Sequence, residues 1–289
     1  MNHKMTSSER TGQIIIDIIL ILVALTTVFP FLQVITVSLS TTADINAFGL
    51  HLFPKHFDLG GFKLLLGYSL IWRGYLNTII RVLTGTTLSI FLTVLGAYAL
   101  AQKELPNRTF WTGIIIFTMY FGGGLIPSYL LVKDLGLRNT LFALILPGAI
   151  STYNMIITRN FFMSLPKSLI ESAKIDGAND FRILFQIVLP LSKAILATIA
   201  LWYGVGQWNS WFDCMIYMDK ESGYVLQMVL RRLLLQGQQP DPNGVDVQVI
   251  NPDNMKMAAV IVATVPIMCI YPFFQKYFVK GVMVGSLKG

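Results

Sequence analysis

The chain has 289 residues, of which 54% are hydrophobic and only 13% are charged, and its formal net charge is +7. A soluble domain usually carries about 25% charged residues, so this composition, with a mean hydropathy of +0.62, argues against a soluble protein and for an integral membrane protein. The basic residues lie between apolar runs and form no block, so they point to anionic lipid headgroups rather than to nucleic acid.

The predicted transmembrane helices begin after the polar start at residues 1–13. The apolar run from Ile14 is too long for the core of a cleaved signal peptide. A membrane helix needs about 20 mainly apolar residues to cross roughly 30 Å of hydrocarbon. Windows of this kind predict an all-α membrane protein in which residues 1–289 form a single transmembrane domain. Its six spans are expected at 14–37, 78–101, 111–132, 141–162, 185–207 and 257–278.

Several of these spans contain residues that interrupt helices. Gly122–Gly124 lie in the third span, where they indicate tight packing or a bend. Proline inside a helix predicts a kink, because it cannot donate the helical hydrogen bond and its ring clashes with the preceding turn. Neighbouring helices can satisfy the freed carbonyl group. Prolines at which kinks are expected within predicted spans include Pro30, Pro127, Pro147, Pro266 and Pro272.

Six spans place both termini on the same side of the membrane. A modest excess of Lys and Arg over the shorter loops predicts that this side is the cytoplasm. The two long outer segments are then 38–77 and 209–256. Within the second, the run 224–235 is too short and too charged to cross, so we expect a helix at the membrane interface or against the outer part of the protein.

The most informative cytoplasmic segment is the loop at residues 164–183, which we call the polar loop. Pro166 suits a first helical turn with Ser164 as its cap, and Gly177 suits a left-handed helix end, which predicts a helix over 166–176. Either Asn179 or Asp180 is suited to cap the next helix. On physical grounds this loop is either an amphipathic connector resting on the membrane or a docking element for a partner.

One face of the predicted loop helix is apolar. Leu169, Ile170 and Ala173 recur at helical spacing and form a stripe, while Lys167 and Lys174 point elsewhere. We expect this stripe to provide the fit to a partner if the loop is a docking element.

A motif in the polar loop favours docking. The spacing E-S-A-x3-G-x9-I-x-L-P, which begins at Glu171 and ends at Pro190, resembles the EAA loop of bacterial ABC importer permeases. It departs from that pattern only in Ser172, which replaces the first alanine.

Other segments extend the resemblance over most of the chain. GLRNT at 136–140, WNSWF at 208–212 and the ending at 277–289 are similar to the carbohydrate-uptake branch, which contains the maltose permease pair. The run YVLQMVLRRLLL at 224–235 resembles permeases of Gram-positive importers for complex oligosaccharides and polysaccharide fragments.

The resemblance implies the type I permease fold and one half of a membrane channel that works by alternating access. A second permease, expected to be a different chain, would complete the channel. Two cytoplasmic ATPases would use ATP and Mg, and an extracellular solute-binding protein would deliver a carbohydrate to the outer segments. This chain has no Gly-Lys dipeptide and hence no phosphate-binding Walker A loop, so we expect no cofactor and no enzymatic activity in it.

The resemblance also assigns residues to the contact with the ATPases. The polar loop becomes the coupling helix, and the cytoplasmic tail at 284–289 is expected to touch the ATPases as well. The coupling residues expected in the loop are Glu171, Ser172, Ala173, Asp176, Gly177 and Arg182.

Sugars are usually held by aromatic faces and by amide or hydroxyl groups. Asn154 and Gln207 are the stronger candidates, because buried amides in a membrane are costly and seldom idle. The full set expected along the substrate path is Tyr120, Tyr153, Asn154, Tyr203, Gln207, Trp208, Asn209 and Trp211. Arg81 and Asp17 lie near predicted span ends and are expected to reach the headgroups.

Other functions remain open alternatives. An ABC importer permease for a non-sugar solute would share the polar loop, and an ion-coupled carrier would need ionisable groups at mid-span, which are scarce. A membrane enzyme would need a clustered acid, base or metal set. The cysteines and histidines show no metal-ligand spacing, which predicts no metal site; they are Cys214, Cys269, His3, His51 and His56.

Overall fold

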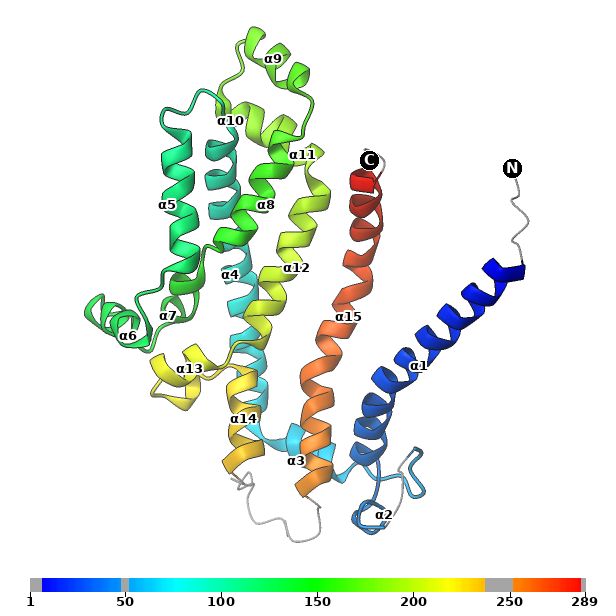
Figure 1. The fold of residues 1–289 in the computed structure, drawn as a ribbon. Coiled ribbons are helices and arrows are strands. Elements are labelled where there is room, and N and C mark those ends of the chain that lie inside the picture. Colours follow the sequence, from blue (N-terminus) through cyan, green and yellow to red (C-terminus); the bar gives the residue numbers. More distant parts are fainter. Residues whose placement is uncertain (1–6, 48–51, 237–251, 287–289) are drawn as a thin grey trace. The chain divides into compact units, whose positions relative to one another are not determined.

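The structure is a computed structural model, and it describes residues 7–47, 52–236 and 252–286 (Figure 1). Within these ranges, side chains are described for residues 10–47, 52–235 and 253–273. The described residues form helices, with one isolated antiparallel bridge between Ser40 and Phe57 as their β structure. The predicted all-α class is therefore confirmed.

The chain divides into two compact units. Unit 1 comprises residues 1–69 and 233–265, and unit 2 comprises 70–232 and 266–289. The single transmembrane domain expected from the sequence stays a prediction. Unit 1 contains α1 (Ser7–Ser38), α2 (Thr42–Ile45), α3 (Gly60–Gly67) and the first part of α15 (Pro252–Ser286).

Unit 2 contains most of the helices. A long helix, α4 (Ser69–Ala101), is followed by shorter ones. These are α5 (Arg108–Tyr120), α6 (Leu125–Asp134), α7 (Leu141–Ile145), η1 (Leu146–Gly148), α8 (Thr152–Met163), α9 (Lys167–Ile175), α10 (Asp180–Ile183), η2 (Leu184–Val188), α11 (Leu189–Leu191), α12 (Lys193–Asn209), α13 (Phe212–Tyr217), η3 (Glu221–Gly223) and α14 (Leu226–Gln236), whose residues from Leu233 on belong to unit 1.

In unit 1 the start of α15 is fixed by one side chain. The amide of Asn254 donates to the carbonyl oxygens of Ser40 at 2.7 Å and Val37 at 3.3 Å. A Cβ atom on Gly61 would lie 1.8 Å from the Asn254 Oδ1, so this approach of α3 requires glycine. These contacts tie three separate parts of unit 1 together.

Among the described residues, three to six segments are long and apolar enough to cross a membrane, and each overlaps one of the predicted spans. Three are single helices, at Arg10–Ser38, Ser69–Ala101 and Asp253–Phe273. The other three are bent helix pairs in unit 2, with bends of 108° between α5 and α6, 54° between α7 and α8, and 84° at Ser192 before α12. Six spans result if each bent pair is one span.

Local backbone chemistry explains the bends. Gly124 has φ +88°, a conformation that side chains disfavour, so the bend that the glycine triplet indicated is confirmed. Pro147 sits in the single 3-10 turn between α7 and α8. The 84° bend was not predicted; it follows the π-helical turn Leu184–Val188 and Pro190, which cannot donate a helical hydrogen bond.

The other prolines do not break their helices. Pro30 lies inside α1, and Pro266 and Pro272 lie inside α15, each of which runs as one helix. Pro127 lies in the first turn of α6, where its missing N–H needs no helical partner. The kinks predicted at these four prolines stay a prediction, because helix continuity does not exclude a bend.

The outer segment 224–235 packs against protein. Leu226, Val229 and Leu230 of α14 are buried. The backbone N–H of Leu226 donates to Thr78 Oγ1 of α4 at 2.8 Å, and the Asn77 amide donates to the Tyr224 carbonyl at 2.9 Å. Of the two alternatives predicted from the sequence, these contacts favour a helix packed against protein over one at the membrane interface, and its outer position stays a prediction.

Candidate functional site

The polar loop holds a short helix, α9, with a well-defined end. Gly177 has φ +79°, the left-handed conformation predicted for it. The N–H of Ala178 donates to the Ala173 carbonyl at 2.9 Å, and the N–H of Gly177 donates to Lys174 at 3.1 Å. These two bonds form the glycine-terminated Schellman motif, which satisfies carbonyls at the helix end.

The caps around α9 differ from the prediction at one point. The Ser164 hydroxyl donates to the Phe161 carbonyl and closes α8, so its predicted role as the cap of α9 is wrong. Pro166 precedes the first helical residue and takes an extended ψ of 120°. Asn179 caps the following helix by accepting from the Arg182 N–H at 2.8 Å, which decides between the two residues proposed for that cap.

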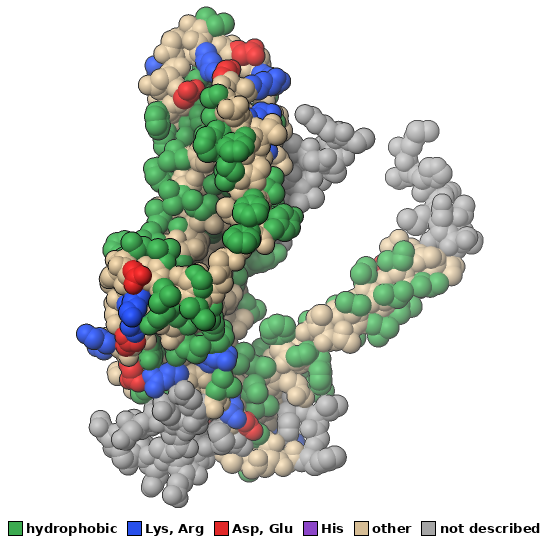
Figure 2. Space-filling model, turned by 60° about the vertical axis from the view of Figure 1, so that its left-hand side comes forward, with side chains coloured by type: hydrophobic (Ala, Val, Ile, Leu, Met, Phe, Trp, Pro, Cys, Tyr) green, Lys and Arg blue, Asp and Glu red, His purple; other side chains and the backbone are tan. Residues whose placement is uncertain are grey.

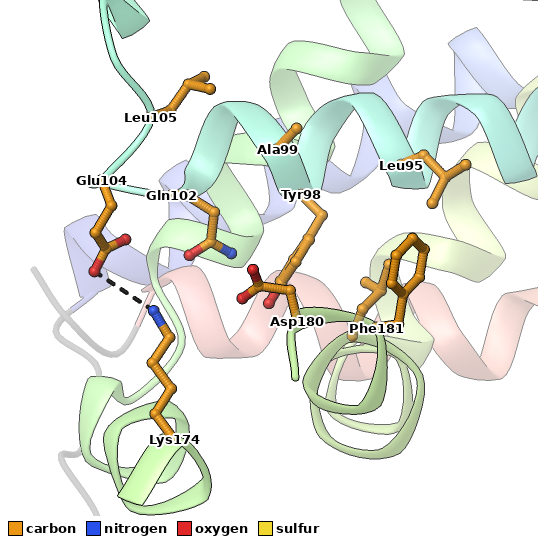
Figure 3. Close-up of a pocket in the computed structure, with 10 residues that line it drawn as sticks. Leu95, Tyr98, Ala99, Gln102, Glu104, Leu105, Lys174, Asp180 and Phe181 are labelled. Atoms are coloured by element: carbon orange, nitrogen blue, oxygen red, sulfur yellow. Dashed lines mark ion pairs between the residues drawn. The ribbon is translucent and has the colours of Figure 1, made fainter. Parts of the chain in front are cut away.

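Two types of contact hold α9 on unit 2. Ile170, Ala173 and Ala178 pack against a core that includes Tyr98 of α4 and Leu184. The Lys174 Nζ also lies 3.5 Å from Glu104 Oε1 (Figure 3). Part of the apolar stripe expected to face a partner thus packs inward, which corrects that expectation.

The outward surface of the loop carries both charge and apolar area. Ile175 is 87% exposed and Phe181 67% exposed. Ala173 is half-buried, while the other five predicted coupling residues are exposed: Glu171, Ser172, Asp176, Gly177 and Arg182. Figure 2 shows charged side chains gathered at this end of unit 2, beyond the apolar surface that covers its helices.

A cavity of about 420 Å³ lies beside the loop (Figure 3). Tyr98 of α4, Gln102 just after its end and Asp180 of the loop line it, and in the figure Tyr98 and Asp180 lie beside each other. Contacts between the loop and the region around the end of α4 include the Glu104–Lys174 ion pair and the packed residues.

Acidification is expected to loosen this anchor. The pKa of Glu104 lies below its ordinary value, because its backbone amide hydrogen-bonds the carboxylate and because the Lys174 ammonium is close. A carboxylate with a lowered folded pKa stabilises the fold above its unfolded pKa, and this stabilisation is lost as the pH falls through the folded value. Hydrogen-exchange protection of α9 should therefore fall below a pH of about 4.

Glu104→Gln provides the control for that measurement. It removes the titrating group, so protection of α9 should start lower and lose its dependence on pH in this window. Protection of α12 should be the same in both proteins. An equal acid response of α9 with and without the carboxylate would contradict the anchoring role.

A second site lies at the other end of unit 2, and we call it the polar cavity. Its volume is about 540 Å³. It is lined by Arg81, Ala143, Leu144, Pro147, Gly148, Ser151, Asn154, Trp202, Tyr203, Gly206, Gln207, Ser210, Asp213 and Tyr217. Hydroxyl, amide and aromatic groups predominate among its polar side chains, which suits a ligand rich in hydroxyl groups.

A buried arginine organises the polar cavity. Arg81 of α4 is 2% exposed, and its Nε donates to Gln207 Oε1 at 2.7 Å. Its Nη1 donates to Asp213 Oδ1 at 3.1 Å, its Nη2 pairs with Asp213 Oδ2, and Nη2 also donates to the Leu144 carbonyl at 3.1 Å. The expectation that Arg81 reaches the headgroups is wrong, because α4 begins at Ser69 and places it inside the protein.

Asp17, the other residue assigned to the headgroups, lies on the exposed α1 and accepts a hydrogen bond from Gln13 at 3.0 Å. Its contact with headgroups stays a prediction.

Four of the predicted substrate-path residues gather at the polar cavity. Asn154, Tyr203 and Gln207 line it. The Tyr203 hydroxyl already binds Thr93 Oγ1 at 2.7 Å and the Ser151 N–H at 3.0 Å, so its ring face is the part left for a ligand. Tyr153 is adjacent, with its ring 5.9 Å from that of the cavity residue Trp202.

The other four do not line this cavity. Tyr120 is 82% exposed at the end of α5, and Asn209 is exposed at the end of α12. Trp208 is buried against a separate apolar cavity of about 220 Å³. Trp211 lies under the Arg231 guanidinium, whose Cζ is 3.6 Å from the ring centroid.

Sequence reasoning missed Arg81 and Asp213 as cavity residues. A charged residue inside an apolar run is a functional-site signal by default. That signal was lost because the predicted span began at Thr78 rather than at Ser69, which placed Arg81 near the membrane surface. Ser151, Trp202 and Ser210 carried no distinguishing pattern.

Comparison with known proteins gives the family. The model for "binding-protein-dependent transport system inner membrane component" matches residues 14–284. The chain belongs to this family. It is therefore a multi-pass inner-membrane transport component and not an enzyme.

Two curated relatives in the family come from Bacillus subtilis (strain 168). Protein LplC is 41% identical over 265 residues, covering 91% of this chain and 90% of the relative. The polygalacturonan/rhamnogalacturonan transport system permease protein YtcP is 40% identical over 273 residues, covering 93% and 96%.

A solved structure supports the same assignment. It belongs to a bacterial ABC transporter involved in the import of the acidic polysaccharide alginate. The matched chain is 30% identical and superposes with a TM-score of 0.87, covering 96% of this chain and 100% of that one. The predicted type I permease fold is confirmed by this likeness.

Proposed function

We propose that this chain is the permease subunit of an ATP-driven importer that moves an oligosaccharide or polysaccharide fragment across the cell membrane by alternating access. The proposal rests chiefly on the polar loop, a helix anchored on unit 2 that exposes Ile175 and Phe181 among charged side chains. Hydrocarbon cannot cover apolar groups beyond the charged end of the membrane helices, so a protein partner is the fitting cover.

The partner at the polar loop is an ABC ATPase. Ile175 and Phe181 provide the apolar contact, together with Leu169, which is also exposed. Glu171 makes no ion pair within the described residues, so its charge is available to a basic group of the ATPase. Ser172, Asp176, Gly177 and Arg182 complete the surface, and Ala173 joins it to the core.

The proposal extends to the rest of the assembly. Two ATPase subunits bind ATP and Mg, and this chain binds no cofactor. A second, different permease completes the channel, an extracellular solute-binding protein delivers cargo, and both termini lie in the cytoplasm of a bacterial cell. The tail contact with the ATPases belongs to the same proposal, and residues 287–289 of that tail lie outside the described residues.

The polar cavity and the relatives support carbohydrate as cargo. Asn154, Gln207 and Ser151 offer amide and hydroxyl groups, and Trp202 and Tyr203 offer ring faces. YtcP is named for polygalacturonan and rhamnogalacturonan transport, and the structural relative belongs to an alginate importer. A permease of a non-sugar ABC importer would share the polar loop, but the amide, hydroxyl and ring groups of the cavity favour a sugar as cargo.

Purification from native membranes tests the assembly. We expect two nucleotide-binding subunits to co-purify with this chain, and Glu171→Lys to lower ATP-driven uptake of labelled oligosaccharide more than tenfold at an unchanged amount of protein in the membrane. Lys167→Glu, which reverses a charge on the same helix, is the control for a general effect of charge. A chain that transports cargo without ATPase partners would instead support an ion-coupled carrier.

A further inference from the structure

The polar cavity contains two charged side chains, and they neutralise each other. Arg81 donates to both carboxylate oxygens of Asp213. The other polar side chains in the lining are Ser151, Asn154, Trp202, Tyr203, Gln207, Ser210 and Tyr217, all uncharged in ordinary conditions. The part of the cavity that this chain supplies therefore has no net charge.

The two members of the pair face the cavity differently. The Arg81 side chain is 2% exposed, while that of Asp213 is 24% exposed. Asp213 Oδ1 also accepts from Ser210 Oγ at 3.0 Å and from the Cys214 N–H at 2.8 Å. The turn between α12 and α13 thus orients the carboxylate independently of Arg81.

The guanidinium of Arg81 is already engaged by other groups of the protein, so it is not free to bind an anionic ligand. Its guanidinium already binds Asp213, Gln207 and the Leu144 carbonyl, which joins α4 to three other elements of unit 2. An acidic cargo would have to displace Asp213 to pair with it, and would then leave a second carboxylate in a poorly solvated site.

We infer that the Arg81–Asp213 pair is the charge-selectivity determinant of the cargo site. By cancelling the charge of Arg81, Asp213 lets the cavity bind uncharged sugar surfaces through amide, hydroxyl and ring contacts and gives no advantage to cargo carboxylates. The inference rests on the proposed function, because it concerns the cavity that would hold the carbohydrate.

Replacing one member of the pair should change the affinity for an acidic sugar in the opposite direction to replacing the other. Without the carboxylate, the buried guanidinium leaves one positive charge that attracts an acidic sugar. Without the guanidinium, the partly exposed carboxylate repels it. When both charges are removed the cavity is again neutral. The preference between charged and uncharged sugars should then return to that of the wild type, even if both bind more weakly.

Trigalacturonic acid and its fully methyl-esterified form test this, because they match in size and differ in charge. Binding of each is measured to the purified full assembly in nanodiscs without the solute-binding protein, which would otherwise impose its own selectivity. The measured quantity is the ratio of the Kd for the ester to the Kd for the acid.

We expect the wild-type protein to bind the ester at least as tightly as the acid. Asp213→Asn should raise the ratio at least tenfold, Arg81→Gln should lower it at least tenfold, and the double variant should return it to within about threefold of wild type, because paired residues are coupled. Asp219→Asn, which breaks an exposed pair with Arg138 outside the cavity, should leave it unchanged.

If Asp213→Asn or Arg81→Gln prevents assembly, a further variant tests the same inference. Asn154→Lys adds one cation to the cavity lining while the pair stays intact, and it should raise the ratio as Asp213→Asn does.

An unchanged ratio in the variants that assemble would overturn the inference and leave the pair a structural one. Absence of binding of both forms to wild type would overturn the assignment of this cavity to cargo. Failure of the ATPases to co-purify would count against the proposed function itself, which separates the two failures.

Discussion

Replacing Gly177 by valine is expected to abolish ATP-driven uptake, whereas Gly177→Asn should retain most of it. The reason is the φ of +79°, which costs an L-residue roughly 1–2 kcal/mol and a β-branched residue more, while asparagine tolerates it best. No heavy atom lies within 4 Å of a Cβ at this position, so the difference would come from the backbone and not from a clash.

The damage would spread from the turn to the docking helix. An altered turn breaks the bonds from Gly177 and Ala178 to the end of α9, and Ala178 leaves the core it packs against. Uptake of labelled oligosaccharide in membranes with matched protein amounts measures the effect. Equal transport by the valine and asparagine variants would contradict the requirement for this turn.

The largest loss of stability is expected from Asp213→Ala. It leaves the Arg81 guanidinium buried without a counter-ion, and breaking one side of a buried pair typically costs about 3–5 kcal/mol. The double variant Arg81→Met, Asp213→Ala should be less destabilised than Asp213→Ala alone, because it removes the unpaired charge. Denaturant titration of the purified protein in detergent would give the free energies of unfolding.

The Arg138–Asp219 pair offers a matched control for burial. Its side chains are much more exposed than Arg81, and Asp219 also accepts from the Asn139 amide at 2.8 Å. Because water screens exposed pairs, Asp219→Ala should cost a small fraction of the loss at Asp213. Similar losses at the two sites would show that burial of Arg81 does not determine the effect.

Features that depend on a few neighbouring residues were predictable from sequence. Gly177 ends α9 and Asn179 caps the next helix because each requirement lies within one turn of chain. The bend near Gly122–Gly124 follows for the same reason. The apolar runs also located each of the six membrane segments, since hydrocarbon thickness sets their length.

Features that depend on tertiary packing were not predictable in the same way. The residues from Ser69 to Asn77 include polar and charged side chains, so no apolar window revealed that α4 starts there and encloses Arg81. The partner of Arg81 is Asp213, far along the chain, and no periodicity links the two. Ile170 and Ala173 lie on an apolar face, but only the folded chain shows that this face is already covered.

The 84° bend at Ser192 determines how motion can pass between the two ends of unit 2. Since α12 leaves that bend at a steep angle, a shift of the preceding segment along its own axis would push the start of α12 sideways and would tend to turn the helix instead of sliding it lengthwise. Gln207 lies fifteen residues beyond this pivot, or roughly 22 Å at about 1.5 Å per residue. A turn of only about 5° would move its amide by roughly 2 Å, which is enough to make or break a hydrogen bond.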